Sequence, residues 1–168
     1  MNYPKYELVT GDAIEQGDFF DNVPVLNPVY ATSLLSEKEQ EATLDVEQIE
    51  LVSMIVVSQT CDISKNTSGE PKGQIILCRR DGEKEYKEKD IEEIRKERYH
   101  YYHLLTPFED IVLERQIIDF SFVYVVSLKF LVDFARDTSK TRIRLLSPYR
   151  EKFAQRFGYY YSRVALPN

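Results

Sequence analysis

The chain has 168 residues, of which 43% are hydrophobic, and a formal net charge of −6 at pH 7. This length suits one domain, over residues 1–168, that buries roughly 70% of the surface its unfolded form exposes. With no apolar run of the roughly 18 to 20 residues that cross a bilayer, and no apolar signal-peptide core at the start, the sequence excludes a helical membrane protein and predicts a cytoplasmic one.

The first fifty residues predict extended chain followed by a polar insertion. Gly11 and Gly17 lie beside aspartates in TGDAIEQGDFF, a composition typical of the ends of a short strand. Pro24 and Pro28 then favour extended chain at the edge of a sheet, because proline offers no backbone N–H to a neighbouring strand. The acidic residues 31–50 are predicted to be an insertion before the first core strand.

Two paired core strands are predicted in LVSMIVVSQTCD, residues 51–62, and QIILCRR, residues 74–80. Both are rich in β-branched residues, and the SKNTSGEPKG segment between them holds residues that favour turns. The apolar part of the first strand ends at a polar cluster, Ser58 to Asp62. We expect this cluster at the rim of a small β-structure, where functional residues often lie.

The remaining segments alternate between strands and helices. Residues 81–98 interleave acids and bases at helical spacing and predict a charged surface insertion. Strands are expected in RYHYYHLL, in RQIIDFSFVYVV, where Phe120 and Phe122 share a face, and in TRIRLLS. Helices are expected in SLKFLVDFARD and over residues 148–164. Many short strands with peripheral helices indicate a mainly β fold, a small β-barrel with its core over about residues 8–147.

The order of these motifs resembles the PemK/MazF-like superfamily of toxin–antitoxin toxins. The resemblance rests on GDAIEQGDF, MIVVSQ, the turn-rich interval with Asn66, QIILCRR, YHYYHLL, and ERQIIDF leading into LKFLV, which together span about residues 10–135. It implies an SH3-like barrel, commonly a homodimer, that cleaves RNA and is held inactive by an antitoxin segment.

The residues on which that family's chemistry depends are absent. The family's catalytic arginine stands just before the first core strand, where this chain has VEQIELVS, and its Thr or Ser after the second strand is replaced by Arg79 and Arg80. We therefore expect a non-catalytic, protein-binding module of a bacterial toxin–antitoxin or defence system, with an antitoxin-like protein or a defence-complex subunit as partner. The alternative is an endoribonuclease that cleaves single-stranded RNA without metal.

Metal-free RNA cleavage needs a base, an acid and a cation that stabilises the developing phosphate charge. The candidate cations are Arg79 and Arg80, of which only one can point inward on a strand. The candidate proton carriers are Asp12, Glu15 and Asp62. The structural alternative is an arginine–carboxylate pair that joins a loop to a strand.

Cysteine and histidine offer further candidates. Cys61 as a nucleophile lacks support, since the adjacent Asp62 disfavours a thiolate, and a buried thiol is the simpler expectation. His100 and His103 have an odd spacing that puts them on opposite faces of a strand. Together with Cys61 and Cys78 they have the residue types of a zinc site without its spacing, so no metal or cofactor is expected.

The terminal segment is basic within an acidic chain. Residues 126–168 hold 9 Lys and Arg against 3 Asp and Glu, whereas residues 1–125 hold 13 against 25. Aromatic and basic side chains alternate along the terminal helix, a combination that suits RNA or a protein partner. Packing of this helix across the barrel is the alternative. The candidate binding residues are Tyr149, Arg150, Arg156, Tyr159, Tyr160 and Arg163.

Overall fold

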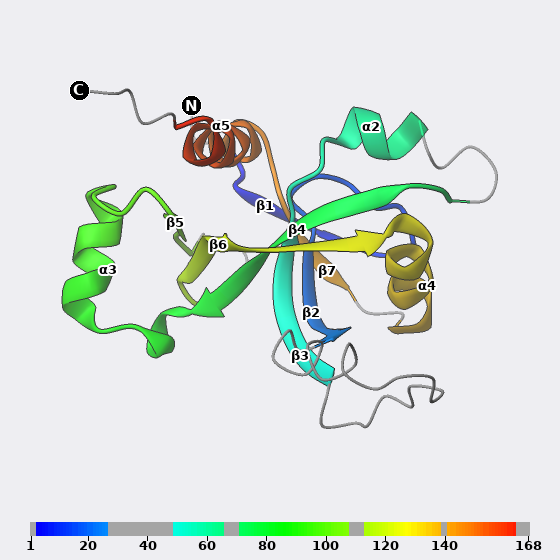
Figure 1. Ribbon diagram of the computed structural model, residues 1–168, viewed down its shortest axis with the longest axis horizontal. Coiled ribbons are helices and arrows are strands. Elements are labelled where there is room, and N and C mark those ends of the chain that lie inside the picture. Colours follow the sequence, from blue (N-terminus) through cyan, green and yellow to red (C-terminus); the bar gives the residue numbers. More distant parts are fainter. Residues whose placement is uncertain (1–2, 27–48, 66–70, 108–112, 139–140, 164–168) are drawn as a thin grey trace, which may run out of the picture.

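The computed structural model describes residues 3–26, 49–65, 71–107, 113–138 and 141–163. Strands and helices alternate along the chain, and the strands dominate the centre of the molecule (Figure 1). The elements are β1 (Tyr6–Val9), β2 (Phe19–Leu26), β3 (Ile49–Val56), α2 (Thr60–Lys65), β4 (Gln74–Gly82), the 3-10 helix η3 (Glu83–Glu85), α3 (Glu88–Arg95), β5 (Tyr102–Leu105), β6 (Gln116–Ser127), α4 (Leu128–Thr138), β7 (Arg142–Leu145) and α5 (Tyr149–Ser162).

The strands form two antiparallel sheets that meet at both edges. One has the order β2-β3-β4-β6-β5, and the other pairs β1 with β7. An isolated bridge between Asp18 and Arg144 joins β7 to the start of β2. At the far edge, the Lys5 Nζ and Tyr6 hydroxyl groups both donate to the carbonyl oxygen of Thr106, just after β5. The predicted mainly β class is confirmed, and the strands curl into a partly open barrel.

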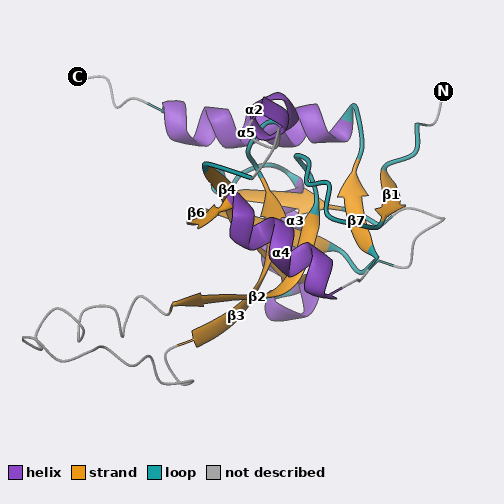
Figure 2. Ribbon diagram, turned by 90° about the vertical axis from the view of Figure 1, so that its right-hand side faces the viewer, coloured by secondary structure: helices purple, strands orange, loops and turns teal. Residues whose placement is uncertain are grey.

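The interior of this barrel is a single apolar cluster to which every strand contributes. Phe153 of α5 packs into it and is fully buried, so this helix covers one end of the barrel (Figure 2). Burial of apolar surface from elements far apart in sequence is the main force that holds the barrel together. The buried members are Tyr6, Phe19, Ile55, Val57, Cys78, Leu105, Ile118, Phe120, Leu145 and Phe153.

Helices cover the other faces of the large sheet. On one side, Leu128, Leu131 and Ala135 of α4 and Ile63 of α2 pack on the outward residues of β2, β3 and β4. On the other, Ile91 and Ile94 of α3 pack on β5 and β6. Figure 1 shows α3 and α4 at opposite ends of the long β4–β6 pair. The expected charged surface helix and C-terminal helix are therefore both present.

Several predicted boundaries differ from the observed ones. Strand β4 continues through Gly82, so only part of the predicted insertion over 81–98 is helical. Residues 98–101 precede β5 as a turn rather than belonging to the strand. Most of the predicted 31–50 insertion lies outside the described residues, and residues 49–50 already belong to β3. Helix α5 starts one residue later than predicted, and residue 164 is outside the described part.

Gly17 occupies a position that no other residue fits well. Its φ is +88°, and a Cβ placed there would lie 2.9 Å from the backbone oxygen of Leu145. We expect Gly17→Ala to cost roughly 2–3 kcal/mol in the free energy of unfolding, because backbone strain and displacement of β7 add. Gly11 is the matched control, since it has a similar φ of +84° but open space around it. Urea unfolding in which both alanine variants lose equal stability would contradict this account.

Candidate functional site

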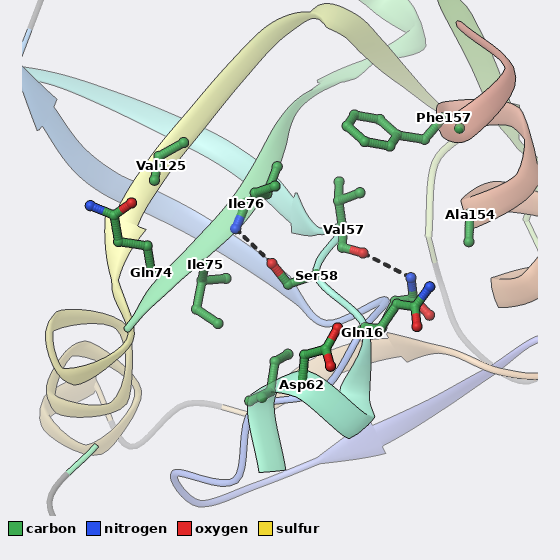
Figure 3. A pocket seen from close by; sticks show the side chains of 13 residues that line it. Gln16, Val57, Ser58, Asp62, Gln74, Ile75, Ile76, Val125, Ala154 and Phe157 are labelled. Atoms are coloured by element: carbon green, nitrogen blue, oxygen red, sulfur yellow. Dashed lines mark hydrogen bonds between the residues drawn. The ribbon is translucent and has the colours of Figure 1, made fainter. Parts of the chain in front are cut away.

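A groove of about 620 Å³ opens beside the polar cluster that ends the first core strand. Figure 3 shows that its walls come from α2, α5 and the adjoining ends of β4 and β6. The segment 57–59 also lines the groove, Asp62 of α2 lies at one rim, and Ala154 and Phe157 of α5 form the opposite wall. The prediction that the SQTCD segment lies at an opening of the β-structure agrees with this arrangement.

Hydrogen bonds fix the shape of the groove. The Ser58 hydroxyl accepts the Ile76 N–H at 2.8 Å, and the Val57 N–H donates to the Ile76 carbonyl at 2.8 Å, so the chain leaving β3 stays on β4. The Gln16 side-chain amide donates to the Val57 carbonyl at 2.8 Å, and its backbone N–H donates to the Thr60 hydroxyl at 3.1 Å. Gln16 therefore ties the N-terminal loop to the groove, a role that sequence analysis missed.

Strand β3 ends at Val56, and Thr60 to Lys65 form the short helix α2, although the sequence placed Thr60 to Asp62 in the polar end of the first core-strand segment. The expectation of a buried Cys61 is also wrong. Its thiol is exposed instead of buried. Its Sγ lies 3.6 Å from Gln59 Oε1 and 3.8 Å from Asp62 Oδ1, so acidic and polar oxygens surround it. No histidine ring contacts the sulfur within the described residues, so no general base lies beside the thiol. The arrangement gives Cys61 no activated-nucleophile chemistry.

The groove has an exposed apolar floor. Ile76 and Val125 are register partners on β4 and β6, and their exposed fractions are 36% and 55%. Phe157 of α5 faces the same space. Of the thirteen described side chains that line the groove, Asp62 alone carries a formal charge. An apolar floor with a neutral and acidic rim suits a protein segment better than a phosphate backbone.

The structure places the candidate cations Arg79 and Arg80 away from this groove and from Asp62 on its rim. The antiparallel register sets Arg79 opposite Met54, whereas Ile76 lies beside Ser58. Three residues along a strand correspond to about 10 Å. Neither arginine lines the groove.

Each of these arginines already has carboxylate partners. Arg79 pairs with Asp81 at 2.9 Å and with Glu50 at 3.5 Å. Arg80 points inward, is buried, and contacts Asp21 and Gln116. Both arginines therefore have the structural role that the sequence offered as the alternative to catalysis, that of an ion pair between segments of the chain.

Asp12 and Glu15 are also engaged in ion pairs within the chain. Asp12 accepts a hydrogen bond from Arg136 at 2.8 Å, and this bond lowers the pKa of its carboxyl group, which makes it a weaker base. Glu15 pairs with Arg144 at 2.7 Å and with Arg150 at 3.8 Å. Neither carboxylate faces Arg79 or Arg80, so the predicted catalytic candidates are not brought together.

The cysteines and histidines are separated as well. Cys78 lies in the barrel interior, where burial, followed by the nearby Asp119, raises the pKa of its thiol to about 12. His103 is buried on β5, while His100 lies in the turn before it and faces Tyr159 at 5.9 Å between ring centroids. Among the described residues, no three His, Cys, Asp or Glu side chains converge as metal ligands.

Helix α5 uses most of its predicted binding residues within the chain. Tyr149 and Tyr160 pack against the barrel cluster. Arg156 donates to the Tyr102 carbonyl at 3.1 Å, and the Arg163 guanidinium lies over the Tyr160 ring at 4.5 Å. Arg150, as described, pairs with Glu15. Tyr159 stays exposed, so packing across the barrel accounts for most of this helix.

No protein-family model matches the chain, and no match was found among the curated proteins or the solved structures. In the described part of the chain, no helix has both the length and the apolar character needed to traverse a bilayer.

Proposed function

We propose that this chain is a non-catalytic, PemK/MazF-like barrel that binds a segment of a protein partner in the groove between α2 and α5. The order of sequence motifs supports a place in a bacterial toxin–antitoxin or defence system. The partner is then an antitoxin-like protein or a subunit of a defence complex. The observation that carries the proposal is the exposed Ile76–Val125 pair on the groove floor, because paired apolar side chains at a concave surface favour protein contact.

The charges of the groove indicate the chemistry of that partner. Asp62 stands at the rim of a groove whose other described lining residues are neutral, and the chain carries a net charge of −6. A matching segment presents apolar side chains to Ile76, Val125 and Phe157 and carries a Lys or Arg that meets Asp62. Such charge complementarity favours the correct partner and speeds its association.

The RNA endonuclease alternative lacks the arrangement that its chemistry needs. A cation within reach of both the phosphate and a proton carrier is required, whereas Arg79 and Arg80 are engaged by Asp81, Glu50 and Asp21 outside the groove. We expect purified protein to leave a mixed pool of single-stranded RNA intact, with and without divalent metal, as followed by gel electrophoresis. Protein-dependent fragments that persist across independent preparations would favour the nuclease instead.

The groove is tested by Val125→Glu. A charge at the centre of an apolar contact commonly costs more than 2 kcal/mol of binding, which weakens affinity by about 30-fold or more. The side chain is half exposed, so the fold tolerates the change. In affinity purification from the native cell, the wild-type chain should retain a stoichiometric protein that the variant loses, and calorimetry with that purified protein should give the affinity ratio.

Leu8→Glu is the matched control, because Leu8 on β1 is 61% exposed and does not line the groove. This variant should retain the partner. The proposal is wrong if Val125→Glu and Leu8→Glu retain it equally, or if no protein accompanies the wild-type chain in stoichiometric amount.

A further inference from the structure

A second hollow, of about 270 Å³, lies on the other side of α5 and has the opposite charge character. Tyr149, Lys152 and Arg156 line it, whereas Ala154, Phe157 and Gly158 line the first groove. At 100° per residue these two sets occupy opposite faces of the helix. The remaining walls come from Lys5 just before β1, from the end of α3 and the turn after it, and from β5 and the residue that follows it. We refer to this hollow as the basic cleft.

The basic cleft concentrates positive charge in an acidic protein. Four of its lining residues are cations from three segments of the chain, and Glu97 is the single carboxylate among the described lining residues. Glu97 pairs with Arg156 at 2.8 Å and with Lys152 at 3.3 Å, so one acid is shared by two cations. Arg95 pairs with Glu92 at 2.7 Å outside the cleft lining, so the other three cations exceed Glu97 by two positive charges. The four cations are Lys5, Arg95, Lys152 and Arg156.

His103 also lines this cleft. Its exposed fraction is 8%, and its ring packs between Phe120 and Phe153, with centroid distances of 6.3 and 5.8 Å. An imidazole at the wall of a cavity can offer a ring nitrogen to a ligand bound there. In its neutral form it has one N–H to donate.

Lys5 also lines the basic cleft and places a second polar group there. Its ammonium group is nearly buried, donates to the Thr106 carbonyl at 2.9 Å and hydroxyl at 2.7 Å, and has the Tyr6 and Tyr149 rings at 5.4 Å. Burial and the neighbouring Lys152 lower the pKa of Lys5 to about 8. Both effects oppose charge at this site, and a bound anion would relieve the second of them.

We infer that the basic cleft binds a phosphomonoester group, with Lys5, Lys152 and Arg156 as its cationic contacts and the His103 N–H as a donor at the base. A phosphomonoester carries about −1.5 to −2 charges at pH 7 and so balances the excess charge better than one carboxylate does. Donors that converge from the residue before β1, from β5 and from α5 also suit a tetrahedral group with three terminal oxygens. The volume of the cleft fits a small ligand.

The two histidines of the chain make the test site-specific. The ring carbon-bound protons of His103 and His100 give separate NMR signals, and only His103 lines the cleft. Titration with inorganic phosphate at pH 7 should shift the His103 signals saturably and leave those of His100 in place. Adenosine 5′-monophosphate distinguishes a nucleotide from the free ion by tighter binding, and acetate should bind more weakly than phosphate.

Variants with opposite expected effects complete the experiment. Lys152→Gln should raise the phosphate dissociation constant about fivefold, since an exposed ion contact contributes up to about 1 kcal/mol. Glu97→Gln removes the competing carboxylate and should lower the constant by a similar factor. Lys129→Gln, which changes an exposed lysine on α4, is the control and should have no effect. The inference is overturned if the His103 shifts do not saturate or if acetate and phosphate bind with equal affinity. It is also overturned if neither Lys152→Gln nor Glu97→Gln changes the phosphate affinity.

Discussion

Asp18→Ala should destabilise the protein by roughly 3–5 kcal/mol, because it removes the buried carboxylate that Arg142 and Arg144 share and leaves Arg144 with only the more exposed Glu15 and Glu7. Asp18 is fully buried and contacts Arg144 through both carboxylate oxygens, with Arg142 at 3.5 Å. It also accepts the Glu15 N–H at 3.1 Å. The total free energy of unfolding of a domain is typically about 5–15 kcal/mol. The loss is measured from urea unfolding followed by circular dichroism.

Asp12→Ala is the matched control for this experiment. Asp12 also pairs with an arginine far along the chain, but both partners of its bridge to Arg136 are exposed. The two variants remove the same chemical group, one from the interior and one from the surface, and only the first should shift the unfolding midpoint clearly. A loss below about 1 kcal/mol for Asp18→Ala would show that water or neighbouring groups compensate the two arginines.

The Asp18 network explains why alternation correctly predicted the strand β7 but not the burial of its arginine side chains. The sequence placed Arg142 and Arg144 on the face opposite Ile143 and Leu145, which for an exposed strand would be the solvent face. Arg144 is nonetheless buried, because its partner lies 126 residues earlier in the chain. Periodicity reveals which residues share a face, but the element that covers that face depends on tertiary contacts.

Strand β6 shows a second limit. The sequence correctly predicted a core strand and put Phe120 and Phe122 on one face. Phe120 is fully buried and Phe122 is half exposed. The reason is a register shift: Cys78 pairs with Val123, while the next residue, Arg79, pairs with Asp119. A bulge of this kind reverses which residues point inward, and its position follows from cross-strand hydrogen bonds that no local pattern displays.

The candidate site was predicted in part for related reasons. The abrupt change from apolar to polar residues after β3 indicated an opening near Asp62, and this needed only local sequence. The floor residues Ile76 and Val125 are apolar strand residues like those of the core, and the sequence does not show that their face of β4 and β6 stays exposed at this end of the strands. The basic cleft escaped notice because its four cations come from segments separated by up to about 150 residues.

Acidification should destabilise the protein through His103 before its carboxylates titrate. Burial, followed by the charges of Arg156, Lys152 and Lys5, lowers the pKa of His103 from 6.5 to about 3, while Glu97 is the opposing charge in the cleft. The unfolded chain binds a proton below pH 6.5 and the folded chain does not, so stability is full above pH 6.5 and falls toward pH 3. The expected loss is about 1 kcal/mol between pH 7 and 5.5 and no more than about 5 kcal/mol by pH 3.

The contribution of His103 is measured from the slope of the unfolding free energy against pH. Urea unfolding of the wild type and of His103→Gln at several pH values between 7 and 5.5 gives the pH dependence of each, whatever the substitution does to stability at pH 7. The slope should largely vanish in His103→Gln and persist in His100→Gln, which replaces the exposed histidine of the same segment. Phosphate-free buffer is needed, because a ligand in the basic cleft would stabilise the folded state by mass action. Equal slopes in the wild type and His103→Gln would mean that the folded protein protonates His103 readily, and that the cleft is better hydrated than its contacts indicate.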